Sequence, residues 1–231
     1  MSNLKTIKMK RLLIIAILAV ITAFTASAQT YDYDVDEIRD NWEKTITVPA
    51  SDAPIVEKLF KAWSKEFPTT FWGIFDQYQK TGNTNNQGLY DYKVDYAPKN
   101  GFIEVYGSWT MVSDGEGQFA KGDTITRENI LHAVYWNLPS GNKLFGVSIE
   151  ADGEIFANCA VMFYEYNVAK NVLTPRLDVV KRVYDKMGIS YPPEGGDAET
   201  FVKLPKVGRD IKYYDYESRG DKVIKWNGNG F

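Results

Sequence analysis

The sequence YDYKVDYAPKNGFIEVYGSWTM at residues 90–111 predicts two antiparallel strands joined by a short turn. Over residues 90–96, aromatic or apolar side chains alternate with charged ones, which is typical of a strand with one buried and one solvated face. Residues 98–101, Pro-Lys-Asn-Gly, have the chemistry of a turn, because Pro fixes φ and Gly tolerates a positive φ. Ile103, Val105 and Trp109 then share one face of the second strand. The segment is therefore interpreted as a β-hairpin.

Similar pairs of alternating segments follow along the chain, separated by stretches rich in Pro, Gly, Asn and Ser. Repeated hairpins of this kind predict a meandering antiparallel sheet. Their irregular starting points do not favour a propeller or a solenoid repeat. The further segments are residues 130–138 with 143–150, residues 157–166 with a turn near 167–171, and residues 210–216 with 222–226. The expected strands are centred near residues 93, 105, 134, 146, 162, 213 and 224.

Two helices are predicted before the first strand. Apolar residues at helical spacing indicate a helix over residues 52–67, which Pro68 ends. Ser51 and Pro54 suit its start, because the Ser hydroxyl can accept a bond from a backbone N–H and Pro has no N–H to leave unpaired. A second helix is expected to follow with Thr70 as its cap. Its apolar side would consist of Phe71, Trp72, Phe75 and Tyr78.

One later helix is expected over residues 175–187. Thr174 suits its cap, Pro175 its first position and Gly188 its C-terminal end. Helices at the front, then strands, a late helix and final strands make the fold class α+β rather than alternating α/β. Residues 29–231 are interpreted as a single α+β domain, in which residues 29–50 form an N-terminal arm.

Residues 1–28 have the pattern of a signal peptide. Four basic residues and no acidic one lie within residues 1–11, and an apolar run of thirteen residues follows at 12–24. This run is shorter than the roughly 20 residues that a membrane-spanning helix needs. Ala26-Ser27-Ala28 is a small-residue cleavage site, and the residue after it is Gln29 rather than a Cys for lipid attachment. We expect a secreted or periplasmic protein with no membrane anchor after signal removal.

Composition narrows the range of partners and cofactors. The formal net charge of −3 becomes −7 when the four basic residues of the signal are removed, which argues against a nucleic-acid or anionic-membrane partner. Cys159 is the only cysteine, so no intramolecular disulfide can form and the core must stabilise the fold. Residues 32–43 match a calcium loop only in part, because Glu37 stands where the sharp turn needs Gly. No metal site and no other cofactor are expected.

His132, the single histidine, and Cys159 are not expected to form a catalytic pair. His132 alternates with Val134 and Trp136, and Cys159 alternates with apolar residues in the same way. Both side chains are therefore predicted to lie on packed strand faces, where a thiol is a small and inert hydrophobe. Carboxylates are the remaining candidates for catalysis, because two of them across a sugar bond suffice for glycoside hydrolysis. With thirty acidic residues in the chain, some such pair is expected by chance.

Tyrosines on strands are the candidates for a binding site. Tyr164 and Tyr166 share one strand face, and Tyr214 and Tyr216 share another face with polar neighbours. A half-exposed tyrosine face can stack on a sugar or anchor a partner protein, although cross-strand packing without a ligand explains the same pattern. The leading hypothesis is a non-enzymatic protein that binds a glycan, a peptide or a partner protein through this face. The alternative is a small hydrolase that uses paired carboxylates.

The export signal gives a direct prediction about the mature protein. Its chain is expected to begin at Gln29, because Ala26-Ser27-Ala28 is the cleavage site. N-terminal sequencing or intact mass of the exported protein measures this. A product that retains Met1 would contradict both the cleavage site and the predicted location.

Overall fold

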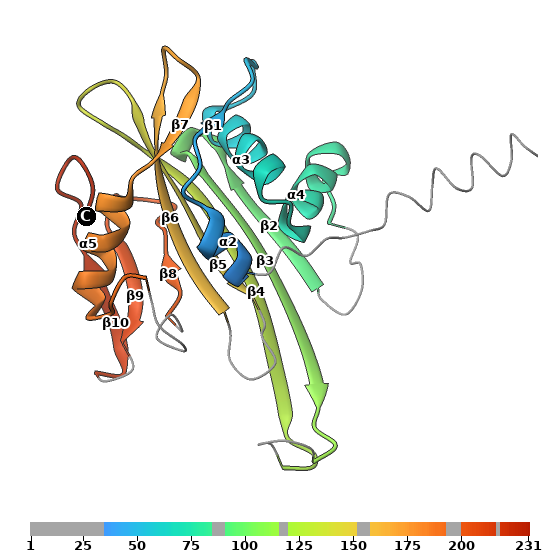
Figure 1. Ribbon diagram of the computed structural model, residues 1–231. Helices are drawn as coiled ribbons and strands as arrows, with labels where there is room; N and C mark the ends of the chain where they lie inside the picture. Colours follow the sequence, from blue (N-terminus) through green and yellow to red (C-terminus); the bar gives the residue numbers. More distant parts are fainter. Residues whose placement is uncertain (1–34, 85–90, 116–119, 152–157, 193–199, 216–217) are drawn as a thin grey trace, which may run out of the picture. The chain divides into compact units, whose positions relative to one another are not determined.

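An antiparallel sheet of seven strands is the central layer of the part of the protein that the structure describes (Figure 1). The structure is a computed structural model that describes residues 35–84, 91–115, 120–151, 158–192, 200–215 and 218–231. The strand order is β1-β7-β6-β5-β4-β3-β2, so the sheet is a meander from β2 to β7, as the sequence predicts. The strands are β1 (Ile46–Thr47), β2 (Asp91–Ala97), β3 (Phe102–Val112), β4 (Thr124–Asn137), β5 (Lys143–Ala151), β6 (Asn158–Asn167) and β7 (Val172–Pro175).

The last strands form a separate small sheet instead of continuing the meander. It consists of β8 (Val202–Lys203), β9 (Ile211–Asp215) and β10 (Gly220–Ile224), in the order β10-β9-β8. The strands expected near residues 213 and 224 are therefore present, but they pair with each other and with β8. Helix α5 (Leu177–Met187) lies between the two sheets in the sequence and takes the chain away from the edge of the large sheet.

Three of the four described α-helices occur where the periodicity predicts them, with shifted starts, and the first lies in the segment interpreted as an arm. The four are α2 (Val35–Asn41), α3 (Ile55–Glu66), α4 (Thr70–Thr81) and α5, and the short 3-10 helix η1 (Pro98–Asn100) makes the turn between β2 and β3. Ser51 does not cap α3, because its hydroxyl accepts a bond from the nearby Ala53 N–H at 3.1 Å. Thr174 and Pro175 pair with β6, so α5 begins only at Leu177. None of the described helices is long and apolar enough to cross a membrane.

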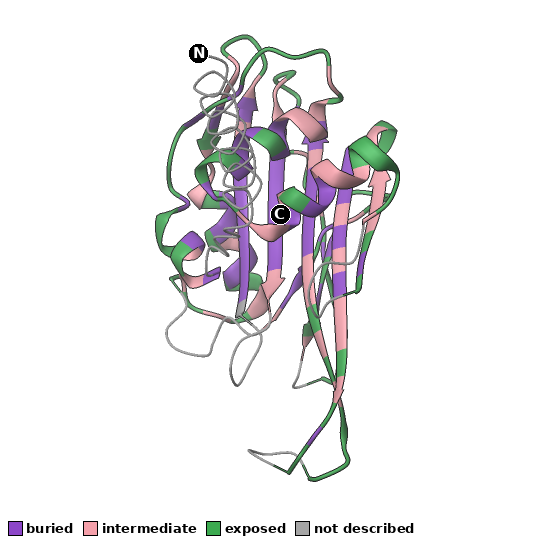
Figure 2. Cartoon of the chain, turned by 90° about the vertical axis from the view of Figure 1, so that its right-hand side faces the viewer, coloured by how far each residue is buried: buried purple, intermediate pink, exposed green. Residues whose placement is uncertain are grey.

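Both faces of the large sheet are covered. Helices α2, α3 and α4 lie over one face, and α5 and the small sheet lie over the other (Figure 1). The middle of the sheet is buried as a result, whereas the far ends of β3 and β4 are not (Figure 2). Residues 144–149 of β5 are all buried, so both faces of this strand are covered, and all of these residues except Ser148 lack a polar side chain.

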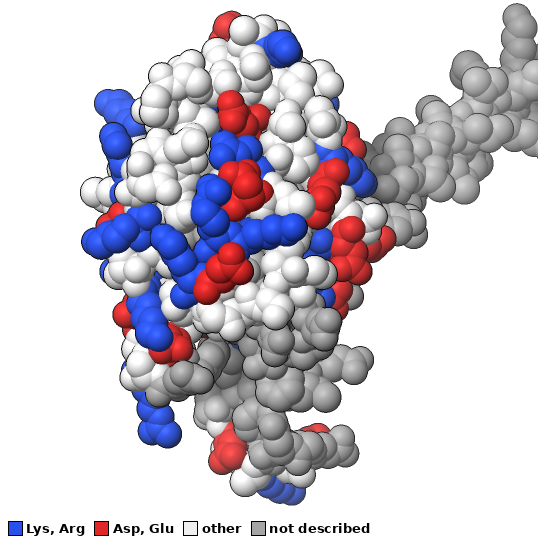
Figure 3. All heavy atoms as spheres, turned by 60° about the vertical axis from the view of Figure 1, so that its left-hand side comes forward, with Lys and Arg blue, Asp and Glu red and all other residues white. Residues whose placement is uncertain are grey.

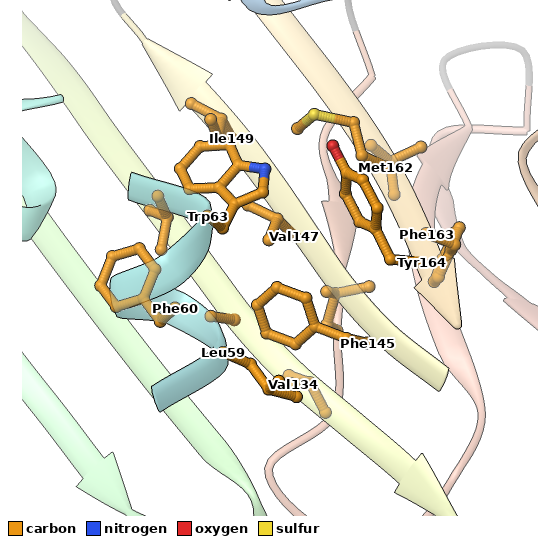
Figure 4. Close-up of a cluster of buried hydrophobic side chains, with 14 of the residues drawn as sticks. Leu59, Phe60, Trp63, Val134, Phe145, Val147, Ile149, Met162, Phe163 and Tyr164 are labelled. Carbon is orange, nitrogen blue, oxygen red and sulfur yellow. The ribbon is translucent and has the colours of Figure 1, made fainter. Parts of the chain in front are cut away.

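Large apolar side chains fill the space between the sheet and α3. Leu59 and Trp63 of α3 lie beside Phe145 and Val147 of β5, whereas the Phe60 ring lies on the other side of the helix, against rings of α4 (Figure 4). All five are fully buried. The Phe60 ring also packs against three other aromatic rings, with centroid separations of 5.3 to 6.2 Å. Since burial of each such side chain contributes about 1.5–3 kcal/mol, this layer is a principal source of stability.

Residues 35–48, which lie in the segment interpreted as an N-terminal arm, contain α2 and β1 and contribute to the core. Ile38, Trp42 and Ile46 are fully buried. The Trp42 carbonyl accepts a hydrogen bond from the Tyr164 hydroxyl at 2.8 Å. The indole N–H of Trp42 donates a hydrogen bond to the Tyr191 hydroxyl at 3.0 Å. The sequence shows no clear period here because the helix has only two turns and the strand has two residues.

Strands β3 and β4 extend past their neighbours as a two-stranded arm (Figures 1 and 2). The pairing of β2 with β3 ends at Ser108, and the pairing of β5 with β4 ends at Ile130. Beyond these points, among the described residues, β3 and β4 pair only with each other as far as Val112 and Thr124. Strand β4 is therefore six residues longer at its start than the sequence pattern indicates.

Replacing Phe60 by Ala is expected to lower the free energy of unfolding by about 3–5 kcal/mol, because the change leaves a cavity among fully buried rings. Lys61→Ala, at the next and exposed position, is the control and is expected to change stability by less than about 0.5 kcal/mol. Urea unfolding measures both variants. Equal stability of the two would contradict this location of the core.

Candidate functional site

Tyr164 and Tyr166 do not form the half-exposed face that the sequence suggests. Both side chains are buried under the N-terminal helices, with exposures of 0% and 1%. The Tyr164 hydroxyl donates to the Trp42 carbonyl, and the Tyr166 hydroxyl donates to Asn171 Oδ1 at 2.7 Å. Burial raises the pKa of Tyr164 well above its usual value. The expectation of exposure fails because alternation along a strand identifies two faces but not which of them other elements cover.

Tyr214 lies on an exposed face, and Tyr216 lies outside the described residues. Tyr214 belongs to β9 and is 38% exposed, whereas its neighbour Tyr213 points inward and is 5% exposed. The Tyr213 hydroxyl donates to the Lys186 carbonyl at 3.2 Å, which attaches the inner side of β9 to the end of α5. Because successive side chains point to opposite faces, this attachment holds Tyr214 toward solvent.

The residues around Tyr214 form what we call the outer face of the small sheet. The strand register places Lys203 of β8 opposite Lys212 of β9, which in turn lies opposite Val223 of β10. Tyr214 lies opposite Asp221. The outer face consists of Lys203, Lys212, Tyr214, Asp221 and Val223, all of them exposed. The inner residues Val202, Ile211, Tyr213 and Ile224 are buried.

Most acidic side chains next to the outer face are already paired. Lys225 Nζ lies 2.8 Å from Asp210, and Lys222 Nζ lies 2.6 Å from Asp215. The bond from Lys222, with those from Ser218, lowers the pKa of Asp215 to about 2. Within the described part of the chain, Lys203, Arg209, Lys212 and Arg219 have no ion pair.

Lys and Arg side chains gather over this side of the protein, with Asp and Glu side chains among them (Figure 3). Between residues 200 and 231 the chain has seven Lys or Arg and four Asp or Glu, although the whole chain is acidic. The net charge of the whole chain does not reveal that basic residues outnumber acidic ones in residues 200–231. A separate charge balance for the last strands would have indicated it.

His132 lies in a row of polar side chains that crosses three strands. The register aligns Glu104 of β3, His132 of β4 and Ser148 of β5 on the same sheet face. His132 Nε2 lies 2.8 Å from Glu104 Oε2, and His132 Nδ1 accepts a hydrogen bond from the Leu204 backbone N–H at 3.1 Å. Both ring nitrogens are therefore occupied, and Ser148 Oγ is buried without a hydrogen-bond partner among the residues that the structure describes. The row has the residue types of a serine-hydrolase triad but lacks the Ser–His bond and access for a substrate.

Cys159 is buried as well, with an exposure of 3%, and His132 has an exposure of 6%. The prediction that both lie on packed strand faces is confirmed. Cys159 lies opposite Glu150, while His132 lies opposite Ser148, so the two belong to different rows of the sheet. That neither residue carries function stays a prediction.

Glu128 and Glu150 are the best candidates for the paired carboxylates that the hydrolase alternative requires. Burial raises the pKa of Glu150, and the charge of Glu128 raises it further, while Lys203 acts in the opposite direction. Glu128 accepts a hydrogen bond from the Tyr106 hydroxyl at 2.7 Å. Two carboxyl groups in different environments are the arrangement that general acid–base chemistry uses. Among the described residues, no group of three or more His, Cys, Asp or Glu side chains is placed to hold a metal ion.

Comparison with models of protein families, with curated proteins and with solved structures gave no match. The assignment of a function therefore rests on the side chains and surfaces of this chain.

The hydrogen bonds of His132 predict its tautomer. Because Nδ1 accepts from the Leu204 N–H, the proton of the neutral ring is expected on Nε2, where it is donated to Glu104. Long-range ¹H–¹⁵N correlation spectra of untagged protein at neutral pH measure this without ambiguity, since the chain has one histidine. A proton on Nδ1 would contradict the bond that joins β4 to residue 204.

Proposed function

We propose that the protein is exported and binds glycan chains, without modifying them, through the outer face of the small sheet. The observation that carries this proposal is Tyr214, an exposed aromatic residue on a strand whose opposite side is anchored in the core. Proposed export rests on the signal pattern of residues 1–28. A binding protein outside the cytoplasm would meet glycans of cell surfaces and matrices.

The chemistry of the outer face favours a glycan over a peptide or a protein partner. A tyrosine ring offers a flat apolar surface for a sugar ring, and its hydroxyl offers a hydrogen bond. Protein interfaces are depleted in Lys, whereas two of the five residues of the outer face are Lys. Extended peptides bind along strand edges through main-chain hydrogen bonds, but Tyr214 lies on the middle strand of the small sheet.

Binding without catalysis is supported by the burial of the Cys, His and Ser side chains discussed above. Cys159, His132 and Ser148 are all buried, and His132 has no nitrogen left to activate a nucleophile. The hydrolase alternative is supported by one observation, the raised pKa of Glu150 beside Glu128. The two proposals differ in whether a bound glycan is cut.

Tyr214→Ala is expected to weaken binding to polysaccharides about tenfold, which equals about 1.4 kcal/mol, because the variant loses the stacking surface. Tyr214→Phe keeps the ring and is expected to bind nearly as well as the unchanged protein. Tyr78→Ala, on α4 in the opposite layer, is the control and is expected to have no effect. Affinity electrophoresis in gels that contain neutral or acidic polysaccharides measures all four proteins.

The same polysaccharides are also tested for cleavage, by measuring new reducing ends after incubation. None are expected. Reducing ends that form with the unchanged protein and disappear with Glu150→Gln would contradict the binding proposal and support the hydrolase. Unchanged binding by Tyr214→Ala would show that the outer face is not the site.

A further inference from the structure

We propose that the bound glycan is an acidic polysaccharide and that Lys203 and Lys212 bind its carboxylate groups. This inference rests on the proposed glycan-binding function and adds the chemical class of the ligand. The central observation is the register of β8 and β9, which places Lys203 directly opposite Lys212 on an exposed face.

Opposed lysines are unfavourable in a protein without a ligand. Like charges at directly opposite positions of an antiparallel pair destabilise the sheet. Neither lysine has an ion pair within the described residues, whereas the nearby Lys222 and Lys225 each have one. The charge of Lys203 lowers the pKa of Glu150 of β5, but burial and the charge of Glu128 raise that pKa and have the larger effect. An anion between the two ammonium groups would remove their repulsion.

The distribution of charge along the chain supports the same ligand. Residues 200–231 have an excess of three basic residues, although the chain after residue 28 has a net charge of −7. At physiological ionic strength charges are screened beyond about 8 Å, so the lysines act on a ligand at the outer face more strongly than distant acidic residues do. Nucleic acid is disfavoured because its dense phosphate charge over a longer contact would meet the acidic remainder of the protein.

The spacing of the three side chains fits a short stretch of acidic polysaccharide. Lys203 and Lys212 lie on neighbouring strands, which are about 4.8 Å apart. Tyr214 follows Lys212 on the same face at two residues' distance, about 6.8 Å along the strand. A sugar ring on Tyr214 therefore has its neighbouring uronic-acid unit within reach of both lysines. Arg209, two residues before the same strand, is a further exposed basic residue close to it in the sequence.

Polygalacturonate and its highly methyl-esterified form are suitable probes, because they share the same sugar rings and differ in charge. We expect the protein to bind polygalacturonate at least tenfold more tightly than the esterified polymer, with an affinity that falls as salt increases. The double variant Lys203→Gln with Lys212→Gln is expected to lose this preference. Lys203→Arg with Lys212→Arg keeps both charges and is expected to retain it.

The matched control is Lys61→Gln with Lys65→Gln, which removes two exposed charges from α3. It is expected to bind polygalacturonate like the unchanged protein. Circular dichroism confirms that each variant is folded before binding is measured. An equal loss in the control would show that total charge, not the outer face, determines binding, and would overturn the inference.

The outcomes separate this inference from the function on which it rests. Equal binding of both polymers that still depends on Tyr214 would leave the glycan-binding proposal intact and overturn the role of the lysines. No binding to any neutral or acidic polysaccharide would overturn the glycan-binding proposal itself. A preference for polygalacturonate that is lost only in the Lys203 and Lys212 glutamine variant would support both.

Discussion

The need to cover both faces of the large sheet determines most of this structure. With Cys159 as the only cysteine, no disulfide can replace the packing of apolar side chains. Helices α2, α3 and α4 cover one face, with Leu59 and Trp63 of α3 beside the sheet (Figure 4). On the other face, Trp136 of β4 stacks on Trp226 with ring centroids 5.9 Å apart, and its indole N–H donates to the Arg209 carbonyl at 3.1 Å. Double coverage also buries Tyr164, His132 and Cys159, so these side chains do not form an exposed surface on the large sheet.

Polar contacts then fix where the small sheet lies. His132 connects Glu104 of the large sheet to the Leu204 N–H just after β8, and the Tyr213 hydroxyl reaches the end of α5. Buried polar groups need partners, since an unsatisfied one costs about 1–3 kcal/mol, so these bonds favour one docked arrangement of the small sheet over shifted ones. The two sides of β9 therefore differ, with Tyr213 buried on the inner side and Tyr214 exposed on the outer side, where we propose that a ligand binds.

Local sequence patterns predicted most helices and strands. Strand pairing and register depend on long-range packing, and the sequence patterns did not show them. The hairpin at residues 90–111 and the apolar stripe of α5 are readable because alternation and helical spacing are local properties. The strands β1 and β8 have two residues each and leave no period to detect. Thr174 and Pro175 suit a helix start, yet pairing with β6 places them in a strand. Within the candidate site, Tyr214 could be found from its polar neighbours, whereas the opposed lysines depend on a register that no local pattern specifies.

The small sheet can accommodate two opposed lysines because its stability comes from its other face. Repulsion between like charges across a strand pair costs about 0.2–1 kcal/mol in an exposed position. Val202, Ile211 and Ile224 are each at most 3% exposed, and burying one such side chain contributes about 1.5–3 kcal/mol. The inner face therefore offsets the unfavourable pair several times over. A surface of this kind can keep charges that weaken the isolated protein slightly and that become favourable when an anion lies between them.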